Sequence, residues 1–401
     1  MATNEQEVAY VYKRRYSDKQ VAQIVMRECP TFFQMAKEGG FDGAGLWYGI
    51  TYGNPQGVSS GFAAAQGAAN GLKGVQLAVQ TKLKYGVIQL DGPSMEKARG
   101  SKGSFFDFVT RHTDGILEQM GQDLAFDLMR DGTGVRGQRA SISTNVVTLT
   151  NRRDVDHFKV GMTVVAGPNR DGSSLRTGET TVAKLNRRAG TIDLTSAAAI
   201  TSFANSDFLF RKGDPGECME GMESCTPLIA PTSADTFRGL TAPGRSVDVE
   251  ALAGSRIDDD SLFPEESLAD VAVEISTIGK KVRKGVVYPT TFMQIVKRTG
   301  AQVEYEPGPT ADIGFEFINL VTPAGRIQLY SDANIPADRG RVFRPDAHLL
   351  KHLNEVVHVV RTNGDPQMQL YNADGIEIRT RFMGNYVQFD TAPHGVVKVA
   401  A

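Results

Sequence analysis

The hydrophobic and polar positions in the first quarter of the chain predict a long two-stranded hairpin. Residues 45–53 (GLWYGITYG) have the aromatic and β-branched composition of a strand. In residues 75–87, apolar side chains alternate with Gln and Lys, as in a strand with one apolar face. Residues 54–74 between them are almost entirely Gly, Ala, Ser, Asn and Gln, and lack the bulk of a core. We expect a protruding hairpin with a flexible tip, too thinly packed to be stable without a partner to lie on.

The strongest helical pattern follows the hairpin. Apolar residues recur at helical spacing after Ser104, which is the expected N-cap. The helix is expected to run to Arg130, a length of roughly 40 Å, and the glycines of the DGTG sequence that follows are suited to end it. Met120 and Leu124 are expected on the buried face of this helix.

After the helix the pattern changes to short β-runs separated by turn sequences. Five strands within about 75 residues predict a small inserted β-barrel or sandwich over residues 140–213. The expected strands are 146–150, 162–167, 180–186, 190–195 and 208–213.

The remaining residues mix short helices and strands, which gives the whole chain an α+β layout. Residues 214–265 are irregular and rich in Pro, Gly and Asp. A second amphipathic helix is expected with Pro264 near its start, and its apolar face would carry Leu268, Val271, Ile275 and Ile278. The other expected elements are helices at 290–298 and 346–353, and strands at 314–320, 326–330, 356–361, 367–371, 376–383 and 387–390.

The N-terminal residues are interpreted as an arm, with an ordinary frayed terminus as the alternative. They contain one short helical stretch at 18–29, which Pro30 would end. No signal peptide is expected, and no apolar run approaches the roughly 18 residues that span a membrane. Three cysteines do not form a secreted disulfide framework, so we expect synthesis in a reducing cytoplasm.

Composition and charge narrow the function. The chain contains 42 Gly, above the usual share of about 7%, which favours turns and β-structure. The formal net charge is −2, and the basic residues form only short groups such as 13–15 and 280–281. A protein that reads duplex DNA through its phosphates needs a concentrated basic surface. The sequence therefore argues against a nucleic-acid reader, but it suits a container that must not hold a polyanion tightly.

Two motifs resemble cofactor or metal sites but lack the required context. Residues 132–137 match G-x-G-x-x-G, but a helix is expected before them and a strand after them, the reverse of the dinucleotide fingerprint. His348 and His352 would lie one helical turn apart, but Leu349 occupies the position of the zincin glutamate. Glu355 is near, without completing a ligand set. A surface helix with two histidines is the preferred interpretation.

Other candidate ligands are also isolated. Cys218 and Cys225 do not have zinc spacing and are interpreted as incidental thiols, like Cys29. Residues 258–260 with Glu265 and Glu266 could hold a divalent cation, but a solvated loop is the preferred interpretation. No nucleophile elbow, Walker A or paired-carboxylate motif occurs. We therefore expect no enzymatic activity, no catalytic residue, no cofactor and no metal.

The order of parts resembles the major capsid proteins of tailed double-stranded DNA bacteriophages, which have the Hong Kong 97-type fold. That order is an N-terminal arm, an extended loop, a long spine helix, and peripheral and axial domains. Short strings carry the resemblance over roughly residues 45–395: 84–87 (KYGV), 90–92 (LDG), 95–96 (ME), 101–106 (SKGSFF), 131–134 (DGTG), 158–162 (FKVGM), 239–240 (GL), 245–248 (RSVD), 252–254 (LAG), 375–376 (GI), Arg379, Phe389 and 392–393 (AP).

The resemblance implies a division of the chain into seven segments. They are an arm (1–44), the extended loop (45–91), a peripheral domain with the spine helix (92–139), an inserted β-domain (140–213), a second peripheral segment (214–285), an axial domain (286–365) and C-terminal strands that return to the peripheral domain (366–401).

It also implies a function and partners. The subunit would assemble as hexamers and pentamers into an icosahedral shell in the host bacterial cytoplasm, and its final location would be the virion. Other expected partners are a separate scaffolding protein, a portal protein at one vertex and a decoration protein. The shell would enclose double-stranded DNA without sequence-specific binding, and no membrane is involved. The alternatives are an encapsulin-like nanocompartment shell and, in a different class, a metal-dependent or hydrolytic enzyme.

Six residues are the expected contacts between subunits. Tyr52, Asn54, Phe62 and Lys73 lie on the extended loop, and Arg245 and Asp248 follow the irregular segment. The last two would form an ion pair, either across an interface that is repeated many times or within a local turn.

Overall fold

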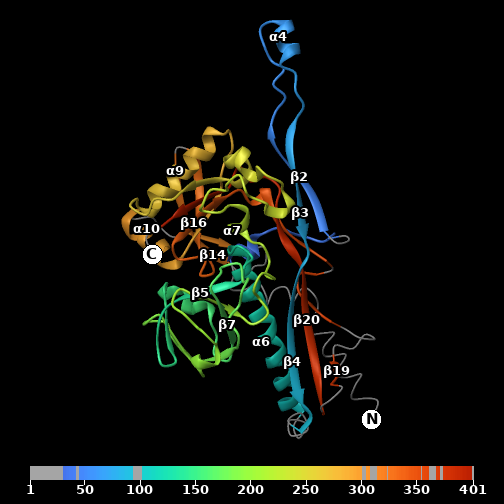
Figure 1. The fold of residues 1–401 in the computed structure, drawn as a ribbon, viewed down its shortest axis with the longest axis vertical. Helices are drawn as coiled ribbons and strands as arrows, with labels where there is room; N and C mark the ends of the chain where they lie inside the picture. The colour runs from blue at the N-terminus through green and yellow to red at the C-terminus, as the bar shows by residue number, and fades with distance from the viewer. Residues whose placement is uncertain are drawn as a thin grey trace. The chain divides into compact units, whose positions relative to one another are not determined.

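The computed structural model describes residues 30–41, 45–93, 102–299, 304–307, 314–322, 324–353, 355–360, 367–370 and 374–399. The expected helix at 18–29 and Cys29 lie outside these residues. The chain forms two compact units (Figure 1). Unit 1 takes its described residues from 1–40, 82–220 and 351–384, and unit 2 from 41–81, 221–350 and 385–401. No helix in the described part of the chain is long and apolar enough to span a bilayer.

In unit 1, a strand pair and a helix form the central layer. Strand β4 (Lys82–Asp91) pairs antiparallel with β20 (Gly375–Gln388), in register from Asp91 opposite Gly375 to Lys82 opposite Gly384. Helix α6 (Lys102–Met129) packs on β4. The contact requires glycine at position 86, because a Cβ there would lie 2.9 Å from Ile116 Cγ1.

The long helix is present as expected, with one correction at its start. Met120 and Leu124 are buried, and the helix ends at Met129, just before Gly132, whose φ is +84°. Because the helix begins at Lys102, Ser104 lies inside it rather than at the N-cap.

The alternating run at 75–87 is not one strand, as the sequence suggested. Strand β3 ends at Gln80 and β4 begins at Lys82, in a different sheet. In β4 the buried residues are Gly86, Ile88 and Leu90, and the exposed ones include Leu83, Tyr85 and Val87. Both faces of β4 carry apolar side chains, so the alternation did not determine which face is buried.

Residues 135–211 form a closed six-stranded barrel in the order β10-β5-β6-β9-β8-β7. Its core includes Val147, Phe158, Val182, Ile192 and Leu209. The sequence predicted five strands but missed the first, β5. The strands are β5 (Val135–Ser143), β6 (Val146–Leu149), β7 (Thr163–Gly167), β8 (Thr180–Asn186), β9 (Thr191–Leu194) and β10 (Phe208–Arg211).

Unit 2 is built on a seven-stranded mixed sheet in the order β11-β21-β16-β12-β15-β14-β13. Helix α9 (Pro264–Thr277) packs on it through Leu268, Val271 and Ile275, as predicted, whereas Ile278 lies beyond the helix end and is 40% exposed. The expected helix at 290–298 is α10 (Pro289–Thr299). The strands are β11 (Ser255–Ile257), β12 (Lys284–Val287), β13 (Glu304–Pro307), β14 (Gly314–Thr322), β15 (Gly325–Ser331), β16 (Arg339–Phe343) and β21 (Gly395–Lys398).

The expected helix at 346–353 is wrong. Residues His348–His352 form strand β17, in the sheet that contains β20. His348, Leu349 and Leu350 are all buried, so successive side chains on both faces of the strand are covered, which suits a strand rather than a surface helix. The strands expected at 376–383 and 387–390 are one continuous strand, β20.

The other elements belong to the described residues. They are α3 (Pro30–Gln34), β1 (Lys37–Glu38), β2 (Gly45–Gly53), α4 (Phe62–Gly67), β3 (Lys73–Gln80), α7 (Met222–Cys225), α8 (Val249–Ala253), β18 (His358–Val359), β19 (Gln367–Gln369) and five 3₁₀ turns at 152–157, 197–199, 237–239, 244–247 and 345–347.

The barrel closure gives a prediction about autonomous folding. Strand β10 pairs with β5 through Phe208–Gln138 and Phe210–Val135, so a fragment of residues 134–213 should fold alone. We expect a cooperative thermal transition and a β-type circular dichroism spectrum. A fragment of residues 140–213 is the matched control: it lacks the part of β5 that closes the barrel and should not melt cooperatively. Equal behaviour of the two fragments would contradict the role of β5.

Candidate interaction surfaces and buried polar clusters

The β2–β3 hairpin is anchored at its base within unit 2. The two strands pair from Gly45 opposite Gln80 to Ile50 opposite Val75 and beyond. Ile50 and Leu77 are nearly inaccessible and pack with Leu240 and Leu252. A lone two-stranded ribbon is marginally stable in water, so this packing holds the base of the hairpin in place without a partner.

Arg238 reinforces the anchor. Its guanidinium donates to the Tyr48 hydroxyl and to the Tyr386 carbonyl, both at 2.8 Å. Arg238 is buried and has a φ of +51°, which is unusual for a residue other than glycine. A backbone conformation of this kind persists only where surrounding contacts hold it. These contacts give Arg238 a positioning role at the hairpin base, for which the sequence carried no signal.

The hairpin tip is exposed. Helix α4 closes the far end of the ribbon (Figure 1), so the tip contains regular structure that the sequence did not predict. Val58, Phe62 and Leu72 are 88%, 83% and 63% exposed. The chain approaches itself closely here, because a Cβ on Gly57 would lie 3.2 Å from Ala69 Cα.

The predicted loop contacts fall into two groups. Asn54, Phe62 and Lys73 are exposed. Tyr52 is half-buried and packs against the cluster of Ile50 and its neighbours.

Arg245 and Asp248 do not pair with each other. The Arg245 guanidinium lies on Asp235, with Nε 2.8 Å from Oδ2, and donates to the carbonyls of Ser224 and Cys225. The residue is 6% exposed, so the exposed ion pair inferred from the sequence is wrong. The Asp248 carboxylate accepts from the Ala251 N–H at 3.0 Å and caps helix α8.

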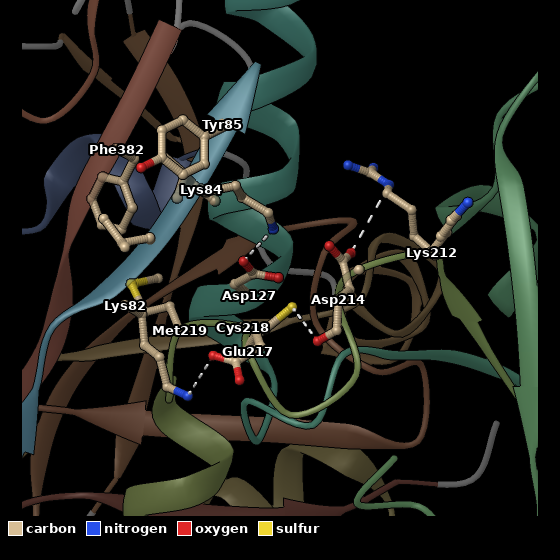
Figure 2. A pocket seen from close by; sticks show the side chains of 14 residues that line it. Lys82, Lys84, Tyr85, Asp127, Lys212, Asp214, Glu217, Cys218, Met219 and Phe382 are labelled. Atoms are coloured by element: carbon tan, nitrogen blue, oxygen red, sulfur yellow. Dashed lines mark hydrogen bonds and ion pairs between the residues drawn. The ribbon is translucent and has the colours of Figure 1, made fainter. Parts of the chain in front are cut away.

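Unit 1 contains a buried cluster of charges at the end of α6. Asp127 Oδ2 lies 2.5 Å from Lys84 Nζ, and both residues line a cavity of about 240 Å³. Figure 2 shows the pair among the other side chains that line this cavity. Asp123 accepts from Arg136 at 3.0 Å and from both terminal nitrogens of Arg211 at 2.5 Å.

The pKa values in this cluster reflect burial and mutual pairing. Burial raises the pKa of Asp123, but Arg136, Lys84 and Arg211 outweigh it and lower the pKa far below its usual range. Burial lowers the pKa of Lys84, yet the neighbouring carboxylates, led by Asp127, leave it raised. Asp123 and Lys84 are therefore charged at neutral pH. Burial leaves the pKa of Asp127 raised despite the opposing effect of Lys84, and its place in the cluster rests on the 2.5 Å contact with Lys84.

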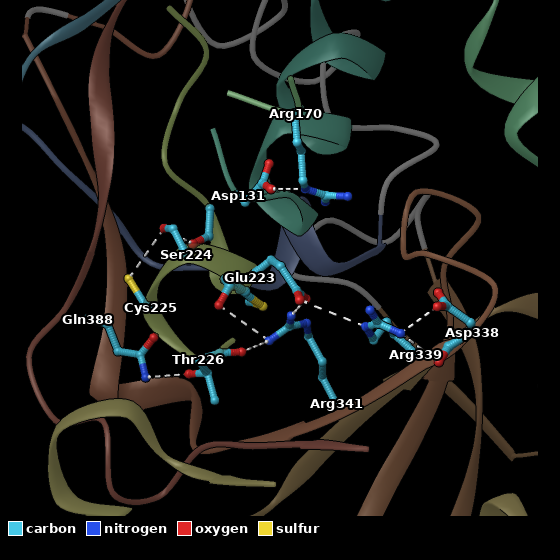
Figure 3. Close-up of polar contacts among 12 residues, drawn as sticks. Asp131, Arg170, Glu223, Ser224, Cys225, Thr226, Asp338, Arg339, Arg341 and Gln388 are labelled. Atoms are coloured by element: carbon cyan, nitrogen blue, oxygen red, sulfur yellow. Dashed lines mark hydrogen bonds and ion pairs between the residues drawn. The ribbon is translucent and has the colours of Figure 1, made fainter. Parts of the chain in front are cut away.

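A second network ties α7 to the sheet of unit 2. Figure 3 shows Arg341 of β16 reaching Glu223. Its Nη1 also donates to the carbonyls of Met222 and Thr226, at 3.3 and 3.1 Å. Arg341 is 3% exposed, so these contacts compensate a buried charge.

The motifs that resembled ligand sites have structural roles. Gly132 and Gly134 have positive φ and connect α6 to β5, so the expected inverted context of the glycine motif is confirmed. Cys218 and Cys225 are buried and form no disulfide within the described residues, and burial raises the pKa of Cys218 well above its usual value. Such a thiol is a poor nucleophile.

The acidic run is neutralised by basic side chains rather than arranged around a cation. Lys398 Nζ lies 3.5 Å from Asp258 and 3.4 Å from Asp260, and Glu265 pairs with Arg298 at 2.5 Å. Within the described residues, no group of three or more His, Cys, Asp or Glu side chains could hold a metal ion.

Comparison with known proteins identifies the fold. No family model matches the sequence, and no curated protein matches it. The capsid asymmetric unit of cyanophage A-1(L) is similar over 92% of this chain and 92% of that chain, with a TM-score of 0.53 and 9% identity. The capsid of Myoviridae phage XM1 also matches, over 92% of this chain and 90% of that chain, with a TM-score of 0.44 and 8% identity. The SrpI encapsulin complex from Synechococcus elongatus matches over 91% of this chain and 84% of that chain, with a TM-score of 0.44 and 8% identity. The similarity to the cyanophage protein confirms the fold that the sequence resembled.

The buried position of Arg245 gives a prediction about stability. Arg245→Glu places a negative charge beside Asp235 in a buried site, so we expect the free energy of unfolding to fall by about 3–5 kcal/mol. Arg326→Glu is the matched control: it makes the same charge reversal at an exposed position of unit 2 and should change the value by less than about 0.5 kcal/mol. Chemical denaturation measures the free energy of unfolding of both variants. An Arg245→Glu variant as stable as the wild type would contradict a stabilising role for Arg245 within its own chain.

His348 predicts how stability depends on pH. Burial lowers its pKa from 6.5 to about 4, so the unfolded chain binds the proton more tightly than the folded one. The stabilisation that neutral His348 contributes to the free energy of unfolding is complete above pH 6.5. It is lost as the pH falls towards 4, by up to about 3 kcal/mol. Denaturation at a series of pH values should show this loss, and His348→Phe should reduce it. The exposed His112→Gln control should retain the full loss; identical profiles for wild type and His348→Phe would refute the assignment.

Proposed function

We propose that this chain is the major capsid protein of a tailed double-stranded DNA bacteriophage. The observation that carries the proposal is the fold shared with the cyanophage A-1(L) capsid over 92% of both chains. Many copies assemble into an icosahedral head shell that encloses the genome. The protein acts as a structural subunit, and its buried charges serve folding rather than catalysis.

The hairpin supports a role in assembly. Its base is fixed by Arg238 and by the packing of Ile50 and Leu77, while its tip exposes the apolar side chains of Val58 and Phe62. Exposed apolar side chains on a thin projection gain free energy when a second molecule covers them. The hairpin therefore serves as the extended loop that contacts a neighbouring subunit, through Asn54, Phe62 and Lys73. Tyr52, half-buried against its own subunit, would contribute only its exposed part.

The other parts receive roles by the same proposal. Helix α6 is the spine helix, residues 135–211 are a β-barrel inserted in the peripheral domain, and residues 286–365 form the axial domain around the capsomer centre. The C-terminal strands from 366 return to the peripheral domain. A closed barrel has no free strand edges, so this insertion can project from a crowded shell without pairing with neighbours.

The proposed partners follow from the shell. The subunit forms hexamers and pentamers, with a portal at one vertex, a separate scaffolding protein during assembly and a decoration protein outside. The net charge of −2 suits a wall that encloses DNA without tight binding. Assembly takes place in the host cytoplasm, and the mature location is the virion.

Assembly of the purified protein tests the proposal. We expect closed shells or capsomers by negative-stain microscopy; a small monodisperse oligomer under all assembly conditions would count against a capsid role. Encapsulin-like behaviour would appear as closed shells that package a protein cargo instead of DNA.

Removing the hairpin tip tests its part in the shell. We expect that replacing residues 56–72 with an Asn-Gly turn leaves a folded subunit but prevents stable closed particles, because the base contacts remain and the tip contacts are lost. Phe62→Asp should reduce particle yield, measured by sedimentation and microscopy. Ser60→Asp is the control, since it adds the same charge to the tip at an exposed position without removing an apolar side chain. Heat-resistant particles of normal yield from the deletion would exclude this role.

A further inference from the structure

One residue pair at the hairpin tip has a sequence that is chemically reactive. Asn70 and Gly71 lie where the chain returns from α4 to β3, and both are exposed. They are the only Asn-Gly pair within the described residues. In such a pair the glycine nitrogen can attack the asparagine side-chain amide, because glycine has no Cβ to obstruct the approach or restrict the backbone. Nothing lies within 4 Å of the position that a Cβ on Gly71 would occupy.

A backbone donor is already in place for this attack. The N–H of Gln56 donates to Asn70 Oδ1 at 2.7 Å. When the Gly71 nitrogen adds to Asn70 Cγ, negative charge develops on Oδ1, and a fixed N–H donor at hydrogen-bond distance stabilises such an oxyanion. Gln56 is thus a positioning residue for chemistry at Asn70.

The same hairpin provides an unreactive counterpart. Asn54 is also exposed, and its side chain is of the same type. It precedes Pro55, whose nitrogen carries no hydrogen and cannot form the neutral cyclic imide.

We propose that Asn70 is a site of spontaneous deamidation, with water as the only co-reactant. The Gly71 nitrogen loses its proton and bonds to Asn70 Cγ; the Cγ–Nδ2 bond breaks, and Nδ2 leaves as ammonia after taking up a proton. Water then opens the five-membered imide at either carbonyl, giving aspartate or isoaspartate at position 70. No oxidant or reductant is needed.

Both products change the tip. Each product adds one negative charge at position 70, and in the aspartate product the carboxylate keeps the Gln56 N–H as a charge-assisted donor. The isoaspartate product also adds a methylene to the main chain between residues 70 and 71, just before β3 begins at Lys73. The modified tip therefore differs in charge and in backbone length from the newly made one.

Peptide mass spectrometry of the intact folded protein after incubation in mildly alkaline buffer tests the proposal. We expect the mass increase for replacement of NH₂ by OH at Asn70, more of it at higher pH, and none at Asn54. Asn70→Gln should abolish the signal in that peptide, and Gly71→Ala should reduce it. An unmodified Asn70 in folded protein, under conditions in which the urea-unfolded chain is modified there, would overturn the proposal.

The role of Gln56 has its own measurement. Gln56→Pro removes the donor N–H, and we expect slower modification at Asn70. The reference is Asn363, which also precedes a glycine and lies outside the described residues; its rate in the same sample should not change. A ratio of the two rates that is unchanged or increased in Gln56→Pro would show that the hydrogen bond does not assist the reaction.

Discussion

Two aspartates one turn apart on α6 hold unit 1 together. Asp123 binds Arg136 of β5 and Arg211 of β10, and Asp127 binds Lys84 of β4. The helix is thereby joined to the first and last strands of the barrel, which pair with each other, and to the central strand pair. Taking these charges out of water is costly, and the cost is recovered only while every partner is present. The geometry at the end of α6 is thus specified by charge pairing as well as by packing.

The β2–β3 hairpin is limited by the lack of a second layer to pack against. A two-stranded ribbon has no second layer, so its stability decreases with distance from the body of the subunit. Near the base, Arg238 and the buried Ile50 and Leu77 supply the missing layer. At the tip, the short helix α4, a few backbone contacts and exposed hydrogen bonds such as Gln56 N–H to Asn70 Oδ1 take the place of a buried layer. The proposed assembly contacts lie at this end, where the subunit alone offers least cover.

Sequence patterns predicted the elements that depend on local periodicity. The helices α6 and α9 and most barrel strands follow from the spacing of apolar residues. A single face is buried in α9, whereas nearly all of residues 121–129 of α6 are buried. The break at Thr81 was missed because β4 is apolar on both faces, and alternation cannot select between two apolar faces. Strand β17 was missed because HLLKH fits either period over five residues.

The buried ion pairs could not be predicted for a different reason. Arg245 and Asp235 are ten residues apart, and Arg341 and Glu223 are 118 apart. Nothing local marks which Arg will be buried, since the pairing depends on tertiary packing. The sequence accordingly assigned Arg245 to a surface pair with Asp248. The exposed residues of the hairpin tip were easier to predict from the sequence, because a segment with few bulky apolar side chains cannot be buried deeply.

The chain enters and leaves the barrel at one place, since Val135 and Phe210 are paired neighbours. In topology it is therefore a detachable module, one that could have been gained or lost in a single insertion. Its first and last strands, however, carry Arg136 and Arg211, the two guanidinium groups that neutralise Asp123. A chain shortened at this junction would leave Asp123 with only Lys84 of the three cations that act on it. Removal of the barrel would therefore upset the charge balance at the end of α6, so the inserted module and Asp123 are energetically coupled.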